Sequence, residues 1–227
     1  MKETLSPTKQ TYLRAIYDLT LKEEVASTSA LADVLGISPA SASGMVQRMA
    51  TMDPPLVQYR KHHGVALSSQ GRREALRILR RHRLIEMFLY EELNYSWAEV
   101  HEEADRLEHV ISQLMEDRIA EKLGHPSFDP HGDPIPTRDL RMKTPDTLLL
   151  TDVQPGVKVI IRRVHEHNAD LLNYFGEVGL RLGRAATVLQ RSPVNGTMHL
   201  QLETQEAPLV IGMQVAEHLF VEILDEE

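Results

Sequence analysis

The hydrophobic pattern changes once along this 227-residue chain. From about residue 8 to residue 123, apolar side chains recur every three or four positions, which is typical of amphipathic helices. Residues 124–145 contain five prolines and little periodicity, and this composition predicts a connecting loop. Beyond about residue 152, short β-branched runs alternate with turn signals, which predicts a small all-β unit. We therefore expect an α+β chain that is helical first and β-rich at its end.

The chain contains no cysteine, which excludes disulfides, thiol nucleophiles and zinc sites built on thiolates. It has no run of 18 apolar residues, and its first residues show amphipathic spacing instead of the apolar stretch of a signal peptide. We therefore expect a cytoplasmic protein with no membrane partner.

Charge is distributed unevenly along the chain. The formal net charge is -8, yet residues 1–83 hold 13 Lys and Arg against 7 Asp and Glu, a balance of +6. The remaining residues hold 12 against 26, a balance of -14. A basic first third predicts a polyanionic partner for that part of the chain, and the acidic remainder predicts cations or protein partners.

The first third has the order of a winged helix-turn-helix. Helical patterns at 8–21, 28–35 and 39–52 are followed by two short alternating runs around a His63-Gly64 turn. The helix at 39–52 begins with small residues that allow close approach to base edges in the major groove of double-stranded DNA. The residues expected to face DNA from this helix are Ser38, Pro39, Ser41, Ser43, Gly44 and Arg48.

The hairpin supplies a second expected contact with DNA. Arg60, Lys61, His62 and His63 form its basic tip, where a wing touches phosphates, and Lys9 and Arg14 are expected to add backbone contacts. Two alternatives remain, because helix-turn-helix units also occur in protein–protein modules and a basic hairpin tip is often only solvated.

Histidines and carboxylates gather on two long helical patterns, at 72–93 and 97–123. Because a helix turns by about 100° per residue, positions 101, 105 and 108 face one way, with 109 beside them. Imidazoles and carboxylates at the rim of a buried seam bind divalent cations well. The candidate ligands are His82, Glu86, His101, Asp105, Glu108 and His109. The alternative is a solvated face of salt bridges, such as Glu102 with Arg106.

An apolar stripe runs along the second pattern, through Val100, Ala104, Leu107, Ile111 and Leu114. Its spacing of four, three, four and three suits packing against another helix or a second subunit.

With these features, the sequence resembles the DtxR/MntR (IdeR-like) family of metal-dependent transcriptional regulators. The resemblance covers nearly the whole chain, through TYLRAIYDL, LADVLGISPASASGMVQRM, LSSQGR, RRHRLIEMFL, VHEEADRLEHV and DPHGDPIPT. The segment YFGEVGLRLGRAATVL resembles the FeoA-type small β-barrel of longer members. The resemblance implies a winged helix-turn-helix domain at 1–72, a helical dimerisation and metal-binding domain at 73–141, a linker at 142–154 and an SH3-like, FeoA-type barrel at 155–227.

The resemblance also implies two metal sites. The primary site would use Thr11, Asp105, Glu108 and His109, and the ancillary site would use His82, Glu86 and His101. Thr11 is a weak ligand where family members have methionine or aspartate, so Glu3, a carbonyl or water is the alternative fourth donor. The barrel positions that match the ancillary donors are Asn168 and Leu171, and the alternative donors are Glu166, His167 and Asp170. A sulfur-free, oxygen-rich set favours Mn²⁺ over Fe²⁺.

The function that the resemblance implies is metal-dependent repression. A homodimer would present two recognition helices to a palindromic operator, and the bound ion would order them. Two rivals are a metallo-hydrolase that uses the same cluster to activate water and an adaptor in which ions only stabilise the fold. The hydrolase needs a substrate cleft, and the sequence offers no phosphate cradle or separate base.

Overall fold

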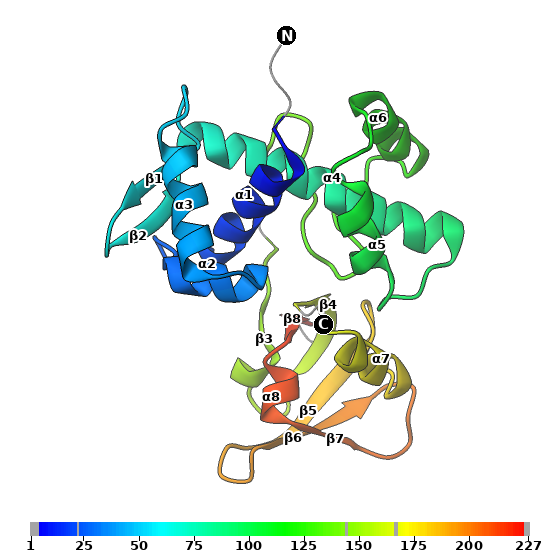
Figure 1. Cartoon of the computed structure of the whole chain (residues 1–227). Helices are drawn as coiled ribbons and strands as arrows, with labels where there is room; N and C mark the ends of the chain where they lie inside the picture. The colour runs from blue at the N-terminus through cyan, green and yellow to red at the C-terminus, as the bar shows by residue number, and fades with distance from the viewer. Residues whose placement is uncertain (1–4, 22, 144, 166–167, 225–227) are drawn as a thin grey trace. The chain divides into compact units, whose positions relative to one another are not determined.

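The structure is a computed structural model that describes residues 5–21, 23–143, 145–165 and 168–224 (Figure 1). It combines helices with two antiparallel sheets, so the predicted α+β class is confirmed. The helices are α1 Pro7–Leu19, α2 Thr28–Leu35, α3 Pro39–Ala50, α4 Ser69–Leu93, α5 Val100–Leu107, α6 Gln113–Lys122, α7 Ala169–Glu177 and α8 Met213–Ala216. The strands are β1 Val57–Arg60, β2 Gly64–Leu67, β3 Leu148–Leu149, β4 Lys158–Val164, β5 Ala185–Ser192, β6 Thr197–Leu202, β7 Leu209–Gly212 and β8 Leu219–Ile223.

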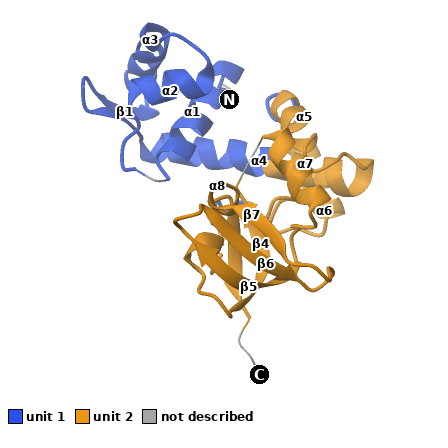
Figure 2. Ribbon diagram, turned by 90° about the horizontal axis from the view of Figure 1, so that it is seen from below, with its two compact units in different colours: residues 1–82, 107–111, 136–141 blue, residues 83–106, 112–135, 142–227 orange. Residues whose placement is uncertain are grey.

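The chain divides into two compact units, which Figure 2 colours separately. Unit 1 contains residues 1–82, 107–111 and 136–141, and unit 2 contains residues 83–106, 112–135 and 142–227. The division on α4 falls directly after His82.

The helices of unit 1 begin and end at capping residues. The Ser27 hydroxyl accepts a hydrogen bond from the Ala30 N–H at the start of α2, and Ser38 does the same for Ser41 at the start of α3. Gly36 ends α2 in the left-handed conformation with φ 62°, which glycine adopts without strain. These caps fix the short turn between α2 and α3.

Helix α3 packs through one face and leaves the other exposed. Ala42, Val46 and Met49 are fully buried, at the four and three spacing of one helical face. The antiparallel hairpin of β1 and β2 follows, with Val57 opposite Leu67 and Arg60 opposite Gly64. Together with α1 and α2 these elements form the predicted winged helix-turn-helix.

The pattern predicted as one helix over residues 97–123 is instead two helices, α5 and α6. Helix α5 ends at Leu107, and the Ser112 hydroxyl caps α6 by accepting from the Met115 N–H. The prediction failed because hydrophobic periodicity continues across the break, whereas the cap at Ser112 starts a new helix. Glu108 and His109 therefore lie in the turn after α5 and not on its face.

Unit 2 contains a six-stranded antiparallel sheet in the order β3-β8-β4-β5-β6-β7. Alternate side chains of β4, β5, β6 and β8 point into its core, which includes Val159, Ile161, Val188, Leu200 and Val221. The strands predicted from alternating runs are all present, and the sheet also takes in β3.

Two helices, α7 and the four-residue α8, lie in the part predicted to be all-β. Helix α7 is capped by Asn168, whose Oδ1 accepts from the N–H groups of Asp170 and Leu171. Leu172 and Phe175, three residues apart, bury its apolar face in the core of the sheet. The sequence does not predict α7 because nine residues are too few to show a clear helical period.

Among the residues that the structure describes, none of the helices is both long enough and apolar enough to cross a membrane.

Candidate metal centre and nucleic-acid interface

Glu108 is the centre of the polar cluster in unit 1. Its side chain is 2 % exposed, although it lies in a turn, because α1 and α4 cover it. The Glu108 Oε2 atom lies 2.7 Å from Arg14 Nη1 and 2.8 Å from His82 Nδ1. Arg81 donates to the Glu108 backbone carbonyl at 2.9 Å. The sequence placed His82 and Glu108 in separate sites, whereas the structure places them in contact.

His109, the next residue, is held in one tautomer by Gln10 of α1. The Gln10 amide donates through Nε2 to the Leu5 carbonyl at 2.7 Å, so its Oε1 is the atom that faces His109 Nδ1 at 3.1 Å. A carbonyl oxygen only accepts, and Nδ1 must therefore carry the proton. The lone pair of neutral His109 then lies on Nε2, the nitrogen suited to bind a metal ion.

Thr11 lies beside that nitrogen. Its Oγ1 is 3.3 Å from His109 Nε2, and Glu108 Oε1 is 3.5 Å from the same atom. Thr11 also donates to the Pro7 carbonyl at 3.1 Å. Thr11, Glu108 and His109, three of the four residues predicted for the primary site, are thus together in unit 1.

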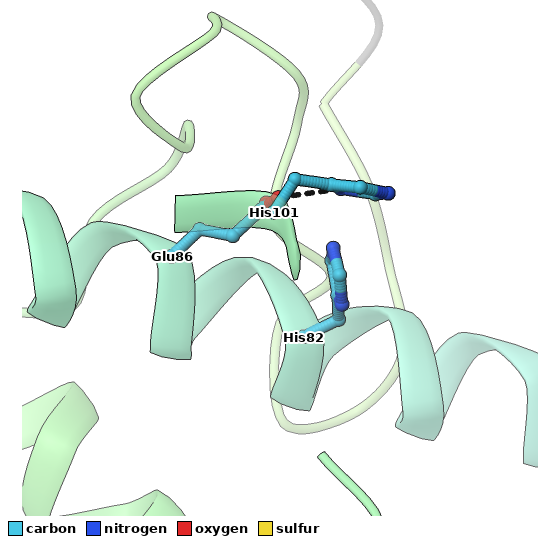
Figure 3. A group of neighbouring side chains, drawn as sticks. All are labelled: His82, Glu86 and His101. Atoms are coloured by element: carbon cyan, nitrogen blue, oxygen red, sulfur yellow. Dashed lines mark hydrogen bonds and ion pairs between the residues drawn. The ribbon is translucent and has the colours of Figure 1, made fainter. Parts of the chain in front are cut away.

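Three further predicted ligands, Glu86, His101 and Asp105, meet in unit 2. The Glu86 Oε1 atom is 3.0 Å from His101 Nδ1, and His101 Nε2 is 3.7 Å from Asp105 Oδ2. Glu86 is 2 % exposed, whereas Asp105 is 43 % exposed. Figure 3 shows the Glu86–His101 interaction, with His82 and Glu86 on successive turns of α4.

Sequence reasoning missed a second group that shares Glu86. One candidate ligand atom from each of Glu86, Asp129 and His131 lies within 4.8 Å of the other two, and all three residues are buried. The DPHGDPIPT segment supplies Asp129 and His131, and in the sequence it indicates only the family resemblance and a linker. The sequence signal for this group is a histidine between two aspartates, which are metal-binding residue types, within one loop.

The loop of this second group is fixed by its backbone. Asp129 Oδ1 accepts from the N–H groups of His131 at 2.8 Å and Asp133 at 2.9 Å. The Val164 N–H donates to the His131 carbonyl at 2.8 Å. A Cβ atom at residue 132 would lie 2.1 Å from the Arg162 carbonyl oxygen, and only glycine fits there.

The chemistry of this group fits a divalent cation. His131 Nε2 lies 3.0 Å from the Trp97 carbonyl, so Nε2 carries the proton and Nδ1 holds the lone pair. Burial lowers the pKa of His131, which keeps the imidazole neutral. Burial raises the pKa of Asp129 well above its ordinary value, and the nearby carboxylates of Glu86 and Asp133 raise it further. Arg83, whose Nε lies 3.5 Å from Asp129 Oδ2, offsets part of this repulsion. A divalent cation between these carboxylates would relieve the rest.

The described residues bring no candidate donor from the FeoA-type domain to a metal site. Glu166 and His167 lie outside the described residues, as does Glu3. Asp170 is exposed at the start of α7, and the Asn168 side chain is engaged in capping that helix.

The predicted DNA-facing residues lie on one exposed surface of α3 and at the hairpin tip. Ser38, Pro39, Ser41 and Arg48 are exposed, and Ser43 and Gly44 are half-buried. Arg60, Lys61, His62 and His63 are exposed, and His62 has a φ of 66° in the turn. Arg14, expected to touch DNA backbone, instead forms the ion pair with Glu108.

Comparisons with known proteins agree with this architecture. Residues 4–65 match the family described as "Iron dependent repressor, N-terminal DNA binding domain", and residues 68–137 match "Iron dependent repressor, metal binding and dimerisation domain". Residues 148–223 match the "FeoA domain".

Individual relatives give the same result. The chain is 31 % identical over 206 residues to the iron-dependent repressor IdeR of Mycobacterium leprae, covering 86 % of this chain and 88 % of the relative. It is 32 % identical over 161 residues to the diphtheria toxin repressor of Corynebacterium diphtheriae, covering 70 % and 68 %. A solved structure of a manganese-dependent transcriptional repressor in complex with manganese is 36 % identical, with a TM-score of 0.86 over 95 % of this chain and 100 % of that one.

The metal-responsive resemblance seen in the sequence is thereby confirmed. Members of this family bind DNA and metal ions and dimerise, and they are regulators without catalytic activity, which sets aside the metallo-hydrolase. Iron and manganese both occur among the relatives. The chain belongs to the iron-dependent repressor (DtxR/IdeR) family of metal-dependent transcriptional repressors, in its long form with a C-terminal FeoA-type domain.

Proposed function

We propose that this protein is a cytoplasmic homodimeric repressor that senses Mn²⁺ or Fe²⁺, binds a palindromic operator and controls genes of metal homeostasis. The observation that carries the proposal is the contact between α1 and the turn after α5. Gln10, Thr11 and Arg14 of α1 all bond to Glu108 or His109 in that turn. A change at the turn therefore acts directly on a helix of the DNA-binding domain.

The donors of the first proposed site are Thr11, Asp105, Glu108 and His109. When bound, a divalent cation supplies two positive charges at these donors. Gln10 keeps the His109 proton on Nδ1 so that Nε2 faces the site, and the buried Glu108 provides the negative charge. The Thr11 hydroxyl links α1 to the same point. Ordering α1 in this way lowers the cost of presenting α3 to DNA.

A second ion is proposed at Glu86, Asp129 and His131. Its support is the burial of all three side chains, their mutual closeness and the tautomer of His131. The predicted ancillary set of His82, Glu86 and His101 shares Glu86 with this group. Oxygen-rich donors without sulfur favour Mn²⁺ as the ion at both sites.

The homodimer is supported by large apolar side chains that stay exposed. In unit 2, Leu114 and Met115 on α6 are 68 % and 49 % exposed, and Leu93 at the end of α4 is 52 % exposed. Exposed apolar groups of this kind mark protein interfaces. Sedimentation of the metal-loaded protein is expected to give the mass of two chains.

The decisive experiment is fluorescence anisotropy with a labelled fragment of the promoter upstream of the protein's own gene. Binding is measured with chelator, with Mn²⁺ and, anaerobically, with Fe²⁺, at one fixed salt concentration because phosphate contacts depend on salt. We expect tight binding that appears with metal and disappears with chelator. Equal binding under all conditions would contradict the proposal.

The Asp105→Ala variant tests the ligand assignment. We expect it to lose metal-dependent DNA binding by about tenfold or more, because a first-site donor is removed. Glu102→Ala is the matched control, since Glu102 is exposed on the same helix and forms an ion pair with Arg106. Unchanged metal dependence in Asp105→Ala would remove Asp105 from the site.

A further inference from the structure

We infer that Arg14 holds the place of the divalent cation in the metal-free protein and must withdraw from Glu108 before the ion binds. This inference rests on the proposed metal-dependent DNA binding. It adds a residue that sets the metal-ion concentration at which the protein responds. Arg14 belongs to α1, three residues after Thr11, and its role follows from two contacts in unit 1.

The guanidinium is bonded to a carboxylate of the first proposed site and to an imidazole beside it. Arg14 Nη1 lies 2.7 Å from Glu108 Oε2 and 2.8 Å from His82 Nδ1. Glu108 and His82 are 2 % and 4 % exposed, so water screens this contact little. One nitrogen of a fixed cation thus contacts a carboxylate and an imidazole at once, which are the donor types that a transition-metal ion takes.

Arg14 and a metal ion are therefore competitors. The guanidinium keeps its charge at every pH at which proteins fold, so it cannot make room by losing a proton. Two positive charges of an ion beside one of Arg14 would repel in a site of low exposure. The competition is relieved only when the side chain moves.

The side chain has a route out of the site. It is 18 % exposed, in contrast to the two groups that it contacts, and its long stem carries the guanidinium toward solvent by rotation alone. Only chains in which Arg14 has already withdrawn from Glu108 can bind the ion. The apparent affinity therefore equals the intrinsic affinity multiplied by the fraction of such chains. Arg14 thereby raises the ion concentration at which the repressor responds.

The test is Mn²⁺ binding by Arg14→Gln, measured from the electron paramagnetic resonance signal of free Mn²⁺. All chains carry Asp129→Asn, which removes the second proposed site. We expect Arg14→Gln to bind Mn²⁺ about tenfold more tightly than the parent, equal to about 1.4 kcal/mol. Arg77→Gln is the control, because Arg77 lies in unit 1 and pairs with Glu74, which is not a proposed ligand. It removes the same charge and should leave the affinity within about twofold.

The metal-free Arg14→Gln chain should also unfold at a lower temperature than the parent, because Glu108 loses its cation. This second readout does not depend on a loaded site. Equal or weaker Mn²⁺ binding by a folded Arg14→Gln chain would overturn the inference, since it would mean that Arg14 assists the ion.

A measurement on the wild-type side chain covers the case in which Arg14→Gln does not fold. The Nε–H resonance of Arg14 is assigned by its loss in Arg14→Lys and followed while diamagnetic Zn²⁺ is added. It should move to the position of a solvent-exposed guanidinium, and an unmoved resonance with Zn²⁺ bound would overturn the inference. If His109→Ala binds as many Mn²⁺ ions as its parent, the proposed function fails, and this inference fails with it. If that site exists but Arg14 does not compete, only the inference fails.

Discussion

Only one neutral tautomer of His109 has its lone pair on Nε2, and Gln10 selects that tautomer. Gln10 is itself fixed by the Leu5 carbonyl, so two hydrogen bonds in series orient the imidazole. We predict that Gln10→Ala weakens Mn²⁺ binding by about 10- to 100-fold, the range found when a group that orients a ligand is removed. Calorimetric titration measures the change.

Gln10→Glu is the matched control for this prediction. A carboxylate still accepts from His109 Nδ1, so the tautomer is kept, but it cannot donate to the Leu5 carbonyl as Gln10 does. Gln10→Glu should therefore retain more Mn²⁺ affinity than Gln10→Ala. Equal Mn²⁺ affinities for Gln10→Ala and wild type would show that the tautomer is set by another group.

Asp129 makes the stability of the metal-free chain depend on pH. Burial raises its pKa well above the ordinary value of 3.8, with Glu86 and Asp133 adding to the effect. A carboxyl with a raised pKa binds more protons in the folded state, so the free energy of unfolding falls as the pH rises through the folded pKa. The loss is complete above that pKa and absent below the unfolded value.

We therefore predict that metal-free Asp129→Asn is more stable than wild type at pH 7, by about 1.4 kcal/mol for each unit by which the pKa is raised. The amide oxygen still accepts from the His131 and Asp133 N–H groups. Urea unfolding at pH 7 and at pH 3 measures the difference, which should shrink at the lower pH. Added Mn²⁺ should stabilise wild type more than the variant, and the opposite order would contradict the second site.

The sequence alone predicts the ligand types but not their grouping. His101, Asp105 and Glu86 were expected to be near one another from helical spacing, and in unit 2 they are. The pairing of His82 with Glu108 and the role of Gln10 depend on how α1, α4 and a turn meet, which no periodicity encodes. Asp129 and His131 escaped notice because they lie in a loop, where spacing carries no directional information.

Gly44 lies within helix α3, and the packing of the helix does not require a glycine there. No heavy atom of the described residues outside the immediate helix lies within 4 Å of a Cβ built on Gly44, and its φ is not positive. Glycine inside a helix costs about 1 kcal/mol relative to alanine. The absent side chain is explained if a partner approaches the helix there, as a DNA groove would.

We predict that Gly44→Ala stabilises the protein by about 0.5–1 kcal/mol in urea unfolding and yet weakens operator binding, because the new methyl group meets the DNA. Gly176→Ala in α7 is the control. Its Cβ would meet only Arg181 Nη2, at an ordinary 3.8 Å, so it should stabilise without changing DNA affinity. Unchanged DNA binding by Gly44→Ala would place Gly44 outside the interface.

Elements were predicted well where their caps are local and poorly where one pattern runs through a break. The boundaries of α2 and α3 follow from Ser27, Gly36 and Ser38, which act within their own turns. The break between α5 and α6 does not interrupt the apolar spacing, and it creates the turn that holds Glu108 and His109. The site therefore sits where sequence periodicity was least informative.

On the scale of the whole molecule, charge decides where a polyanion binds. The chain has a net charge of -8, but its first 83 residues carry +6, and the exposed Arg60 and Lys61 lie at the hairpin tip. Each phosphate contact releases counterions, so the logarithm of the DNA affinity falls linearly with the logarithm of the salt concentration. An acidic remainder does not remove this dependence, because charges beyond a Debye length of about 8–10 Å are screened.

We predict that Lys61→Ala weakens binding to all DNA sequences about equally and reduces the slope of that salt dependence by about 1, as expected for one lost phosphate contact. Anisotropy at saturating Mn²⁺ over a series of KCl concentrations gives the slope. Lys158→Ala is the control, because Lys158 lies on β4 in unit 2 and pairs with Glu203. Its slope should equal that of wild type. If Lys61→Ala keeps the full slope, Lys61 does not contact phosphate, and the salt dependence must come from other basic residues of the first third.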